Sequence, residues 1–266
     1  GPTEVARMNN APAVERLRSA LSSSGLSPGT FLGLGSSPAI EVAALAGCEW
    51  VVLDLEHGGG TLDDVGSSVQ AANAAEIGLI VRVPQPERAV VGWVLDQGVA
   101  GVMLPRIESL DHAREASSWF DYPPSGQRGV ASYTRSAGWG AHSVRDTSRG
   151  VCMVQIETTG ALEAVGDIAA VPGVDSVFLG PLDLSFALGV PEDFDHKDFI
   201  VAMKHFVRGA QKAGIPAGSL ISDPARIASM QAYGLDFLAL GSDALALRRA
   251  LTDQVAEVAA LGKGRS

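Results

Sequence analysis

Eight short apolar runs recur along the chain and alternate with longer stretches of helical spacing. The runs lie near 30–35, 50–55, 79–83, 101–105, 151–156, 175–180, 215–220 and 236–241. Most neighbouring runs are separated by about ten to twenty residues of helical pattern. Continuous apolar runs between helices are typical of strands in a parallel sheet that is covered on both faces.

Eight strand–helix units in a chain of this length predict a (β/α)8 barrel of the TIM type. A doubly wound open sheet is the alternative, and it would be expected to carry a phosphate or dinucleotide fingerprint at its switch point. The only glycine-rich turn after a strand is His57-Gly58-Gly59-Gly60, which matches neither GxGxxG nor GxxxxGKS. The pattern therefore favours the barrel.

The same pattern predicts one barrel domain over residues 13–262, with an additional helix at each end. Residues 13–24 have helical spacing, and residues 244–261 form a long amphipathic helix. Residues 1–12 are expected to form a flexible leader, and Gly1-Pro2 resembles the scar of a removed tag.

Charge and composition exclude several classes of protein. The 266 residues carry a net charge of −10 without a basic stripe, which argues against a nucleic-acid partner. No apolar run reaches the roughly 18–20 residues that span a bilayer, and no signal-peptide pattern is visible. The two cysteines suggest neither a disulfide framework nor a zinc cluster. We expect a cytoplasmic protein that binds small molecules, with no membrane partner.

Two carboxylates follow neighbouring predicted strands, at the end of a barrel where active sites lie. Glu157 comes directly after the fifth run, and Asp183 comes three residues after the sixth. Two carboxylates can share a hard divalent cation and leave other positions for water and substrate oxygens. Alternatively, each residue caps the helix or turn that follows it.

His57 and Arg82 follow or occupy other strands. His57 stands beside the glycine triplet, where an imidazole can accept a proton near neutral pH, although it can equally be a polar loop residue. A guanidinium inside the run 79–83 requires an anionic partner, either a structural carboxylate or a substrate. Asp54 is expected to form an internal ion pair. Gln155 shares a strand side with Glu157 and can bind a ligand oxygen.

Other types of catalytic residue are missing from the strand ends. The lysines, at 197, 204, 212 and 263, are all distant from them in sequence, which argues against a Schiff base. The cysteines fall at strand beginnings, and no GxSxG elbow appears. Carbon-centred chemistry at this site would therefore depend on a metal.

Several motifs in order resemble the HpcH/HpaI aldolase family of metal-dependent, class II pyruvate aldolases. They are VVLDLEHGG, VRVP, VLDQGVAGVMLPRIES, YPPSGQRGV, QIET and PGVDSVFLGPLDLSFALG, and the resemblance runs from about residue 28 to 250. It implies a (β/α)8 barrel of the phosphoenolpyruvate/pyruvate type. It also implies a homo-oligomer, a trimer or hexamer, that assembles through the terminal helix.

The resemblance further implies a role for each candidate residue. Glu157 and Asp183 would hold Mg²⁺, Mn²⁺ or Co²⁺, which the keto acid chelates, and Gln155 would contact the keto acid. The backbone at Gly180, Pro181 and Leu182 would receive its carboxylate.

The remaining roles concern charge and proton transfer. Arg82 would stabilise the enolate oxygen, and His57 would act as the base on the aldol hydroxyl. Asp96, in the block VLDQG, would raise the basicity of that histidine. A cation at a developing negative charge and a base supported by a carboxylate are both favourable for aldol cleavage.

Two positions depart from the family pattern, and one segment interrupts the strand–helix alternation. Leu182 stands where the family usually has alanine, and EHGGG replaces the usual EH followed by a small residue and proline. Both changes affect the expected substrate more than the metal chemistry. Residues 122–149 form a long irregular insert, for which a lid at the barrel mouth and a subunit contact are both open. Arg135 within it resembles a family arginine and has no assigned role.

The expected activity is reversible cleavage of a 4-hydroxy-2-oxo acid into pyruvate, or a related 2-oxo acid, and an aldehyde, through a metal-bound enolate. One alternative is a carbon–carbon bond-forming enzyme that decarboxylates oxaloacetate, as macrophomate synthase does. The other is a barrel that binds 2-oxo acids without catalysis. A citrate-lyase-like acyl-CoA enzyme is less favoured, since that branch generally lacks the EH motif.

Overall fold

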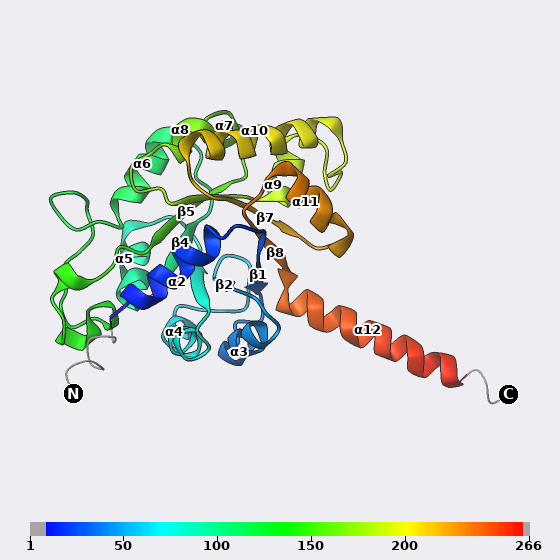
Figure 1. Ribbon diagram of the computed structural model, residues 1–266, viewed down its shortest axis with the longest axis horizontal. Coiled ribbons are helices and arrows are strands. Elements are labelled where there is room, and N and C mark those ends of the chain that lie inside the picture. The colour runs from blue at the N-terminus through cyan, green and yellow to red at the C-terminus, as the bar shows by residue number, and fades with distance from the viewer. Residues whose placement is uncertain (1–8, 263–266) are drawn as a thin grey trace.

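In the computed structural model, which describes residues 9–262, eight parallel strands form one closed barrel (Figure 1). The strands are β1 (Ser27–Leu32), β2 (Trp50–Asp54), β3 (Gly78–Arg82), β4 (Gly101–Leu104), β5 (Val151–Ile156), β6 (Ser176–Leu179), β7 (Ala217–Ile221) and β8 (Phe237–Ser242). Each strand pairs with the next in sequence, and β8 closes the sheet against β1. The predicted barrel is confirmed, and the open sheet is wrong.

Helices surround this barrel, and an additional helix stands at each end of the described chain, as predicted. The helices are α2 (Ala11–Leu21), α3 (Ser37–Leu45), α4 (Asp64–Ala74), α5 (Arg88–Asp96), α6 (Leu110–Ser118), α7 (Thr159–Glu163), α8 (Val165–Ala169), α9 (Pro181–Ala187), α10 (Lys197–Ala213), α11 (Ile227–Tyr233) and α12 (Asp243–Gly262). Three short 3₁₀ helices are η1 (Arg135–Gly140), η2 (Val144–Asp146) and η3 (Pro224–Arg226).

Two elements begin earlier than the sequence pattern indicates. Strand β1 starts at Ser27 instead of residue 30, because the backbone of Ser27 and the residues after it pairs with β8 although the segment is not apolar. Helix α2 starts at Ala11, and Pro12 occupies its first turn, where a missing N–H costs nothing. Residues 1–8 of the predicted leader lie outside the described residues.

The interior of the barrel is filled with side chains and closed at one end by α2. Leu17 of α2 lies against Gly78 and Gly101, the first residues of β3 and β4. Above it, the rings of Trp50 and Phe237 meet edge to face, with their centroids 5.5 Å apart. Higher in the barrel, Phe31 and Phe178 pack with centroids 5.8 Å apart. The barrel is therefore a packed core with one sealed end, at the beginnings of the strands.

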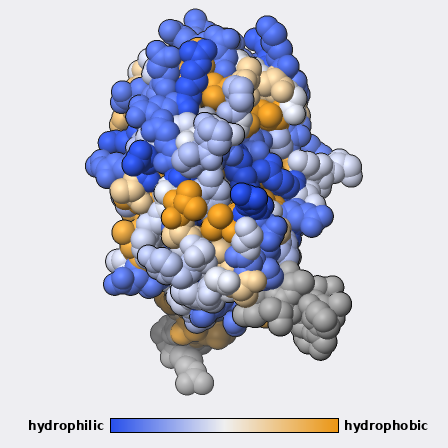
Figure 2. Space-filling view, turned by 90° about the vertical axis from the view of Figure 1, so that its left-hand side faces the viewer, coloured by the Kyte–Doolittle hydropathy of each residue, from blue (hydrophilic) through white to orange (hydrophobic). Residues whose placement is uncertain are grey.

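The irregular insert lies at this sealed end and not at the mouth. The backbone N–H of Asn10, beside the start of α2, donates to Ser136, and the amide of Asn9 donates to the carbonyl of Asp146. Arg128 pairs with Asp96 at the end of α5. Figure 2 views the molecule from the left-hand side of Figure 1, where the insert lies, and shows a mostly hydrophilic face with scattered hydrophobic groups. The lid interpretation is therefore wrong, and the subunit contact stays a prediction.

Helix α12 extends away from the barrel (Figure 1). Its carboxylate at Asp243 accepts hydrogen bonds from the backbone N–H groups of Gly33, at 2.7 Å, and Leu34, at 3.3 Å. Beyond this anchored start, large apolar side chains at spacings of three and four residues are exposed: Leu247, Leu251, Val255, Val258 and Leu261. In residues 9–262 no helix is long and apolar enough to cross a membrane.

Candidate functional site

A cavity of about 250 Å³ opens at the ends of the strands, opposite α2. It is lined by Phe31, Asp54, His57, Arg82, Gln155, Phe178, Gly180, Pro181, Leu182, Asp183, Leu220, Gly241, Ser242 and Leu245. Seven of the nine residues that the sequence singled out for a site are in this lining, and Glu157 and Asp96 are not. The strands bring them together because parallel strands end at the same edge of the barrel.

Asp54 and Arg82 end adjacent strands and form a buried bidentate pair. The guanidinium donates from Nε to Oδ1 at 2.9 Å and from Nη2 to Oδ2 at 2.6 Å. Burial alone would raise the pKa of Asp54, but Arg82 and the backbone N–H groups of His57 and Glu56 hold that pKa below its ordinary value. The predicted internal ion pair is confirmed, and the same guanidinium also faces the cavity.

Arg82 has further contacts that fix its orientation. Its Nη1 lies 3.3 Å from Oε2 of Glu56 and 3.5 Å from Oε1 of Gln155. The guanidinium carbon lies 5.0 Å from the centre of the Phe31 ring. These contacts fix the orientation of the guanidinium at the cavity wall before a ligand binds.

Glu56 belongs to this cluster, although the sequence analysis gave it no role. Its buried carboxylate lies 3.6 Å from Nε2 of His57 and 3.6 Å from Nε of Arg106. Burial raises the pKa of Glu56 above its ordinary value, and the charges of Arg82 and His57 only partly offset this. The spacing of Asp54 and Glu56, two residues apart at a strand end, is the signal that would have identified it.

Glu157 is buried, with 7% of its surface exposed, just behind the cavity wall. Its Oε1 accepts the backbone N–H of Arg106 at 2.7 Å, and its Oε2 accepts the amide of Gln155 at 2.9 Å. Burial raises the pKa of Glu157, and the charges of Asp183 and Glu56 raise it further. Arg106, which follows β4 by two residues, was also missed by the sequence analysis.

Gly180 allows Glu157 and Gln155 to approach the start of α9. A Cβ at this position would lie 2.9 Å from Nε2 of Gln155 and 3.1 Å from Oε2 of Glu157. A side chain here would push both groups away, so only glycine fits. Asp183 stands in the first turn of α9, where a carboxylate also favours the helix dipole.

His57 is an exposed candidate group, with 64% of its side chain accessible to solvent. It follows Asp54 in a turn in which Oδ1 of that residue accepts the backbone N–H of both Glu56 and His57. The glycines after it pack against the β1 loop, and the N–H of Gly59 donates to the carbonyl of Gly33 at 2.8 Å. The imidazole is thus placed at the rim, where a substrate proton can reach it.

The structure does not bring Asp96 to this cavity within one chain. Helix α5 runs from the end of β3 back to the start of β4, so its last residue lies at the sealed end of the barrel. There Asp96 accepts a hydrogen bond from Nη2 of Arg128 at 2.8 Å. The expected contact between Asp96 and His57 is therefore absent from a single copy.

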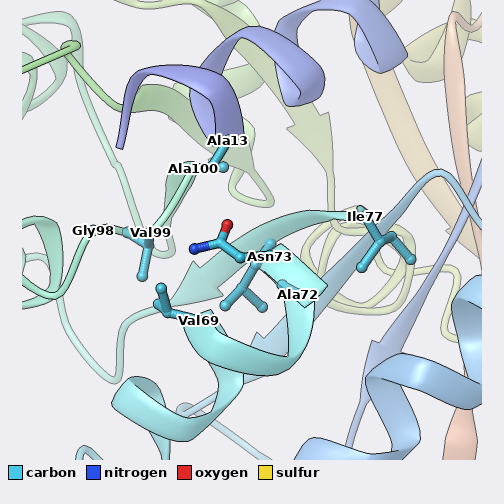
Figure 3. A pocket seen from close by; sticks show the side chains of 9 residues that line it. Ala13, Val69, Ala72, Asn73, Ile77, Gly98, Val99 and Ala100 are labelled. Atoms are coloured by element: carbon cyan, nitrogen blue, oxygen red, sulfur yellow. The ribbon is translucent and has the colours of Figure 1, made fainter. Parts of the chain in front are cut away.

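A second recess, at the sealed end, has a different character (Figure 3). It lies among α2, α4 and the turn before β4, and Asn73 is the one polar side chain that Figure 3 draws in it. It has no room for a water molecule. This recess, unlike the cavity at the strand ends, therefore cannot hold a substrate.

A closed barrel whose mouth gathers a guanidinium, an imidazole and carboxylates from several strands defines a (β/α)8-barrel enzyme. Residues 28–250 match the family described as HpcH/HpaI aldolase/citrate lyase. The chain belongs to this family, as its motifs indicated.

Named relatives agree with this assignment. The chain is 39% identical to hydroxypyruvate/pyruvate aldolase of Paraburkholderia phytofirmans over 239 residues, which cover 86% of this chain and 92% of that protein. It is 34% identical to 2-keto-3-deoxy-L-rhamnonate aldolase of Klebsiella pneumoniae, with 86% and 87% covered.

Solved structures show the same fold. An HpcH/HpaI aldolase/citrate lyase family protein from Burkholderia cenocepacia superimposes with a TM-score of 0.84 at 33% identity, over 91% of this chain and 98% of that one. Macrophomate synthase superimposes with a TM-score of 0.79 at 23% identity, over 95% and 91%, and shows the fold alone.

Proposed function

We propose that this protein is a class II aldolase that reversibly cleaves a 4-hydroxy-2-oxo acid into pyruvate, or a related 2-oxo acid, and an aldehyde. The observation that carries the proposal is that Arg82, Gln155 and Asp183 line one cavity, while the buried Glu157 is hydrogen-bonded to Gln155 just behind its wall. No lysine is among the described residues of the lining. The name of one relative, hydroxypyruvate/pyruvate aldolase, supports pyruvate or hydroxypyruvate as the 2-oxo acid.

Glu157 and Asp183 fit a divalent cation such as Mg²⁺, Mn²⁺ or Co²⁺. The raised pKa of Glu157, caused by burial and by neighbouring carboxylates, marks a site with an excess of negative charge. No three His, Cys, Asp or Glu side chains converge within residues 9–262. Two carboxylates with water and substrate oxygens suit a hard cation. When bound, it would supply positive charge that stabilises the enolate oxygen.

The protein's own groups account for the remaining steps. In the cleavage direction, Nε2 of His57 takes the proton of the 4-hydroxyl group, the C3–C4 bond breaks, and its electrons move to the C2 oxygen as an enolate. Arg82, held by Asp54, stabilises that oxygen. The C4 group leaves as the aldehyde, and a proton from water or from the imidazolium of His57 then reaches C3 and yields the 2-oxo acid.

The first turn of α9 would bind the substrate carboxylate. Backbone N–H groups at the start of a helix attract anions, and Gly180, Pro181 and Leu182 line the cavity there. Since Pro181 has no N–H, the donors would be the backbone N–H groups of Leu182 and Asp183. The amide of Gln155, which lies beside Gly180, would contact the keto end of the substrate.

Asp96 can assist His57 only if a second copy supplies it. We therefore propose a homo-oligomer, a trimer or hexamer, in which α12 of one copy covers apolar surface of another. The exposed leucine and valine side chains of α12 support this. Light scattering of the protein and of the variant Leu251→Glu tests it: the substitution should lower the mass, and a monomeric parent protein would contradict the proposal.

Deuterium exchange into the methyl group of pyruvate, followed by NMR, tests the activity. Exchange should require Mg²⁺, Mn²⁺ or Co²⁺ and stop with a chelator. Glu157→Gln should reduce it about a hundredfold or more, whereas the matched change Glu163→Gln, on the exposed side of α7, should not. Absence of exchange with all three metals would sink the proposal.

The alternative reaction, decarboxylation of oxaloacetate, was suggested by two features of the sequence, the insert and Leu182. The insert that suggested a specialised mouth lies at the sealed end. Only the Leu182 substitution at the cavity remains in its favour. Incubation with oxaloacetate in the presence and absence of an aldehyde distinguishes the two reactions.

A further inference from the structure

A second cavity, of about 300 Å³, adjoins the reaction cavity. It is lined by Pro181, Leu182, Glu192, Phe194, Phe199, Leu220, Ile221, Ser222, Asp223, Arg226 and Met230. Three of these residues, Pro181, Leu182 and Leu220, also line the reaction cavity. The two spaces are therefore neighbours that share one wall, which we call the partition.

The most exposed part of this partition is the side chain of Leu182. Gly180, just before it, is held by backbone hydrogen bonds with Ile156 and Leu184. Pro181 is buried and has a restricted backbone. Leu182, by contrast, is 49% exposed, so its rotamer is not fixed by core packing. A change of rotamer at one residue can widen or narrow the passage.

The interior of the second cavity is apolar. Phe199, Ile221 and Met230 are buried in its wall, and the rings of Phe194 and Phe199 meet at 5.2 Å. An alkyl or aryl group placed there would leave water for a hydrocarbon environment, which is favourable in proportion to the area buried.

The charges at its rim argue against an anionic occupant. Arg226 is engaged by both carboxylate oxygens of Asp195, at 3.0 and 2.7 Å, and lies over the Phe194 ring. Asp223 and Glu192 add negative charge to the lining. The one cation of the lining is thus already neutralised, and an uncharged group is favoured.

We propose that this second cavity is a substrate subsite for an uncharged apolar tail that passes over Leu182 from the reaction cavity. The tail is carried beyond the reacting carbons, either by the aldehyde or by the 2-oxo acid. The inference rests on the proposed aldolase function and specifies its substrate class. Leu182 is then a specificity-determining residue, since the size of its side chain sets the width of the passage.

Two series of substrates distinguish the sources of the tail. One combines pyruvate with acetaldehyde, butanal and hexanal, and the other combines pyruvate, 2-oxobutanoate and 2-oxohexanoate with acetaldehyde. In one series, kcat/KM should rise about threefold for each methylene that enters the cavity. The series that shows the rise identifies the component that carries the tail.

Three variants test the path. Leu182→Ala should raise the ratio of kcat/KM for the longest and shortest substrates about tenfold, and Leu182→Phe should lower it by a similar factor. Met230→Trp, which fills the second cavity from α11, should remove the dependence on tail length. Because each variant is judged by a ratio between two substrates, a partial loss of folded enzyme does not affect the result.

The failure of this inference differs from the failure of the proposed function. If the parent enzyme exchanges the pyruvate methyl protons but shows no length dependence in either series, the subsite is wrong and the aldolase stands. The same holds if Leu182→Ala and Leu182→Phe leave the ratio unchanged. If no exchange occurs with any metal, the aldolase itself is wrong.

Discussion

The two ends of the barrel are built from the same eight strands but differ in the side chains that fill their interior. At the strand beginnings, α2 seals the interior, and the recess beside it cannot hold a water molecule. At the strand ends, an open cavity of about 250 Å³ holds a guanidinium among several carboxylates. The comparison separates a region that provides stability from one in which charges are kept for chemistry.

The largest expected effect comes from Arg82→Ala, which should impair both functions of the open end. It leaves Asp54 and Glu56 buried without their partner, so the free energy of unfolding should fall by about 3–5 kcal/mol. Pyruvate exchange should fall by about a thousandfold. Denaturant titration and NMR measure the two losses, and the exposed Arg114→Ala is the matched control. A variant with full exchange would refute the role of Arg82.

Leu17→Ala tests the sealed end alone. The side chain is fully buried under the barrel, so a cavity there should cost about 2–5 kcal/mol of unfolding free energy. The rate of exchange per folded molecule should not change, because α2 lies opposite the reaction cavity. Leu45→Ala, at an exposed position, serves as the control in the same melts. A lowered kcat with unchanged stability would contradict the division between the two ends.

Glu157→Gln tests the contrast between the two ends from the other side: it should lower activity without lowering stability. Loss of one carboxylate from a two-carboxylate site should reduce turnover about a hundredfold or more. The isosteric amide also removes a charge that its neighbours disfavour, so the melting temperature of the metal-free protein should stay equal or rise. A clear fall in melting temperature would indicate a structural role instead.

Asp243→Ala should have a smaller effect, through the position of His57. The carboxylate holds Gly33 and Leu34, and the carbonyl of Gly33 holds Gly59 in the loop that carries the imidazole. We expect kcat to fall about tenfold with little change in KM. Asp243→Asn keeps an acceptor oxygen and should recover most of the rate. Equal loss in both variants would argue against this chain of contacts.

The smallest effect is a dependence of stability on pH in the metal-free protein. The pKa values of Glu56 and Glu157 are raised in the fold by burial. Their contribution is therefore fully present below their unfolded pKa and is lost as the pH rises through the raised values. Asp54 has a lowered pKa, so its contribution is lost as the pH falls. The melting temperature, measured as the pH rises through the raised pKa values of Glu56 and Glu157, should fall without Mg²⁺. Addition of Mg²⁺ should restore it at the higher pH.

The sequence predicted the barrel because each strand is buried on both faces and therefore forms a continuous apolar run. It also predicted the partner of Arg82, since a guanidinium inside such a run needs a carboxylate from a neighbouring strand. Glu56 was not predicted as a site residue because the candidate base at this strand end was His57, the next residue. The spacing of two residues alone places Glu56 on the same side of the chain as Asp54. Arg106 acts through its backbone N–H, which its residue type does not indicate.

The position of Asp96 illustrates a different limit. A motif match gives a residue its place in the sequence, but it does not say which copy of the chain supplies the side chain. The insert was misplaced for a related reason. Its composition indicates an irregular segment, whereas its location depends on hydrogen bonds with Asn9 and Asn10, far away in sequence.

Helix α12 links the two proposals about this enzyme. Its first turn contributes Leu245 to the wall of the reaction cavity. Its far end, away from the barrel, exposes Val255, Val258 and Leu261. One continuous helix thus connects the wall of the reaction cavity with the proposed contact between copies. Enzyme concentration then becomes a kinetic variable: on dilution the specific activity should decline along the same curve as the fraction of assembled protein.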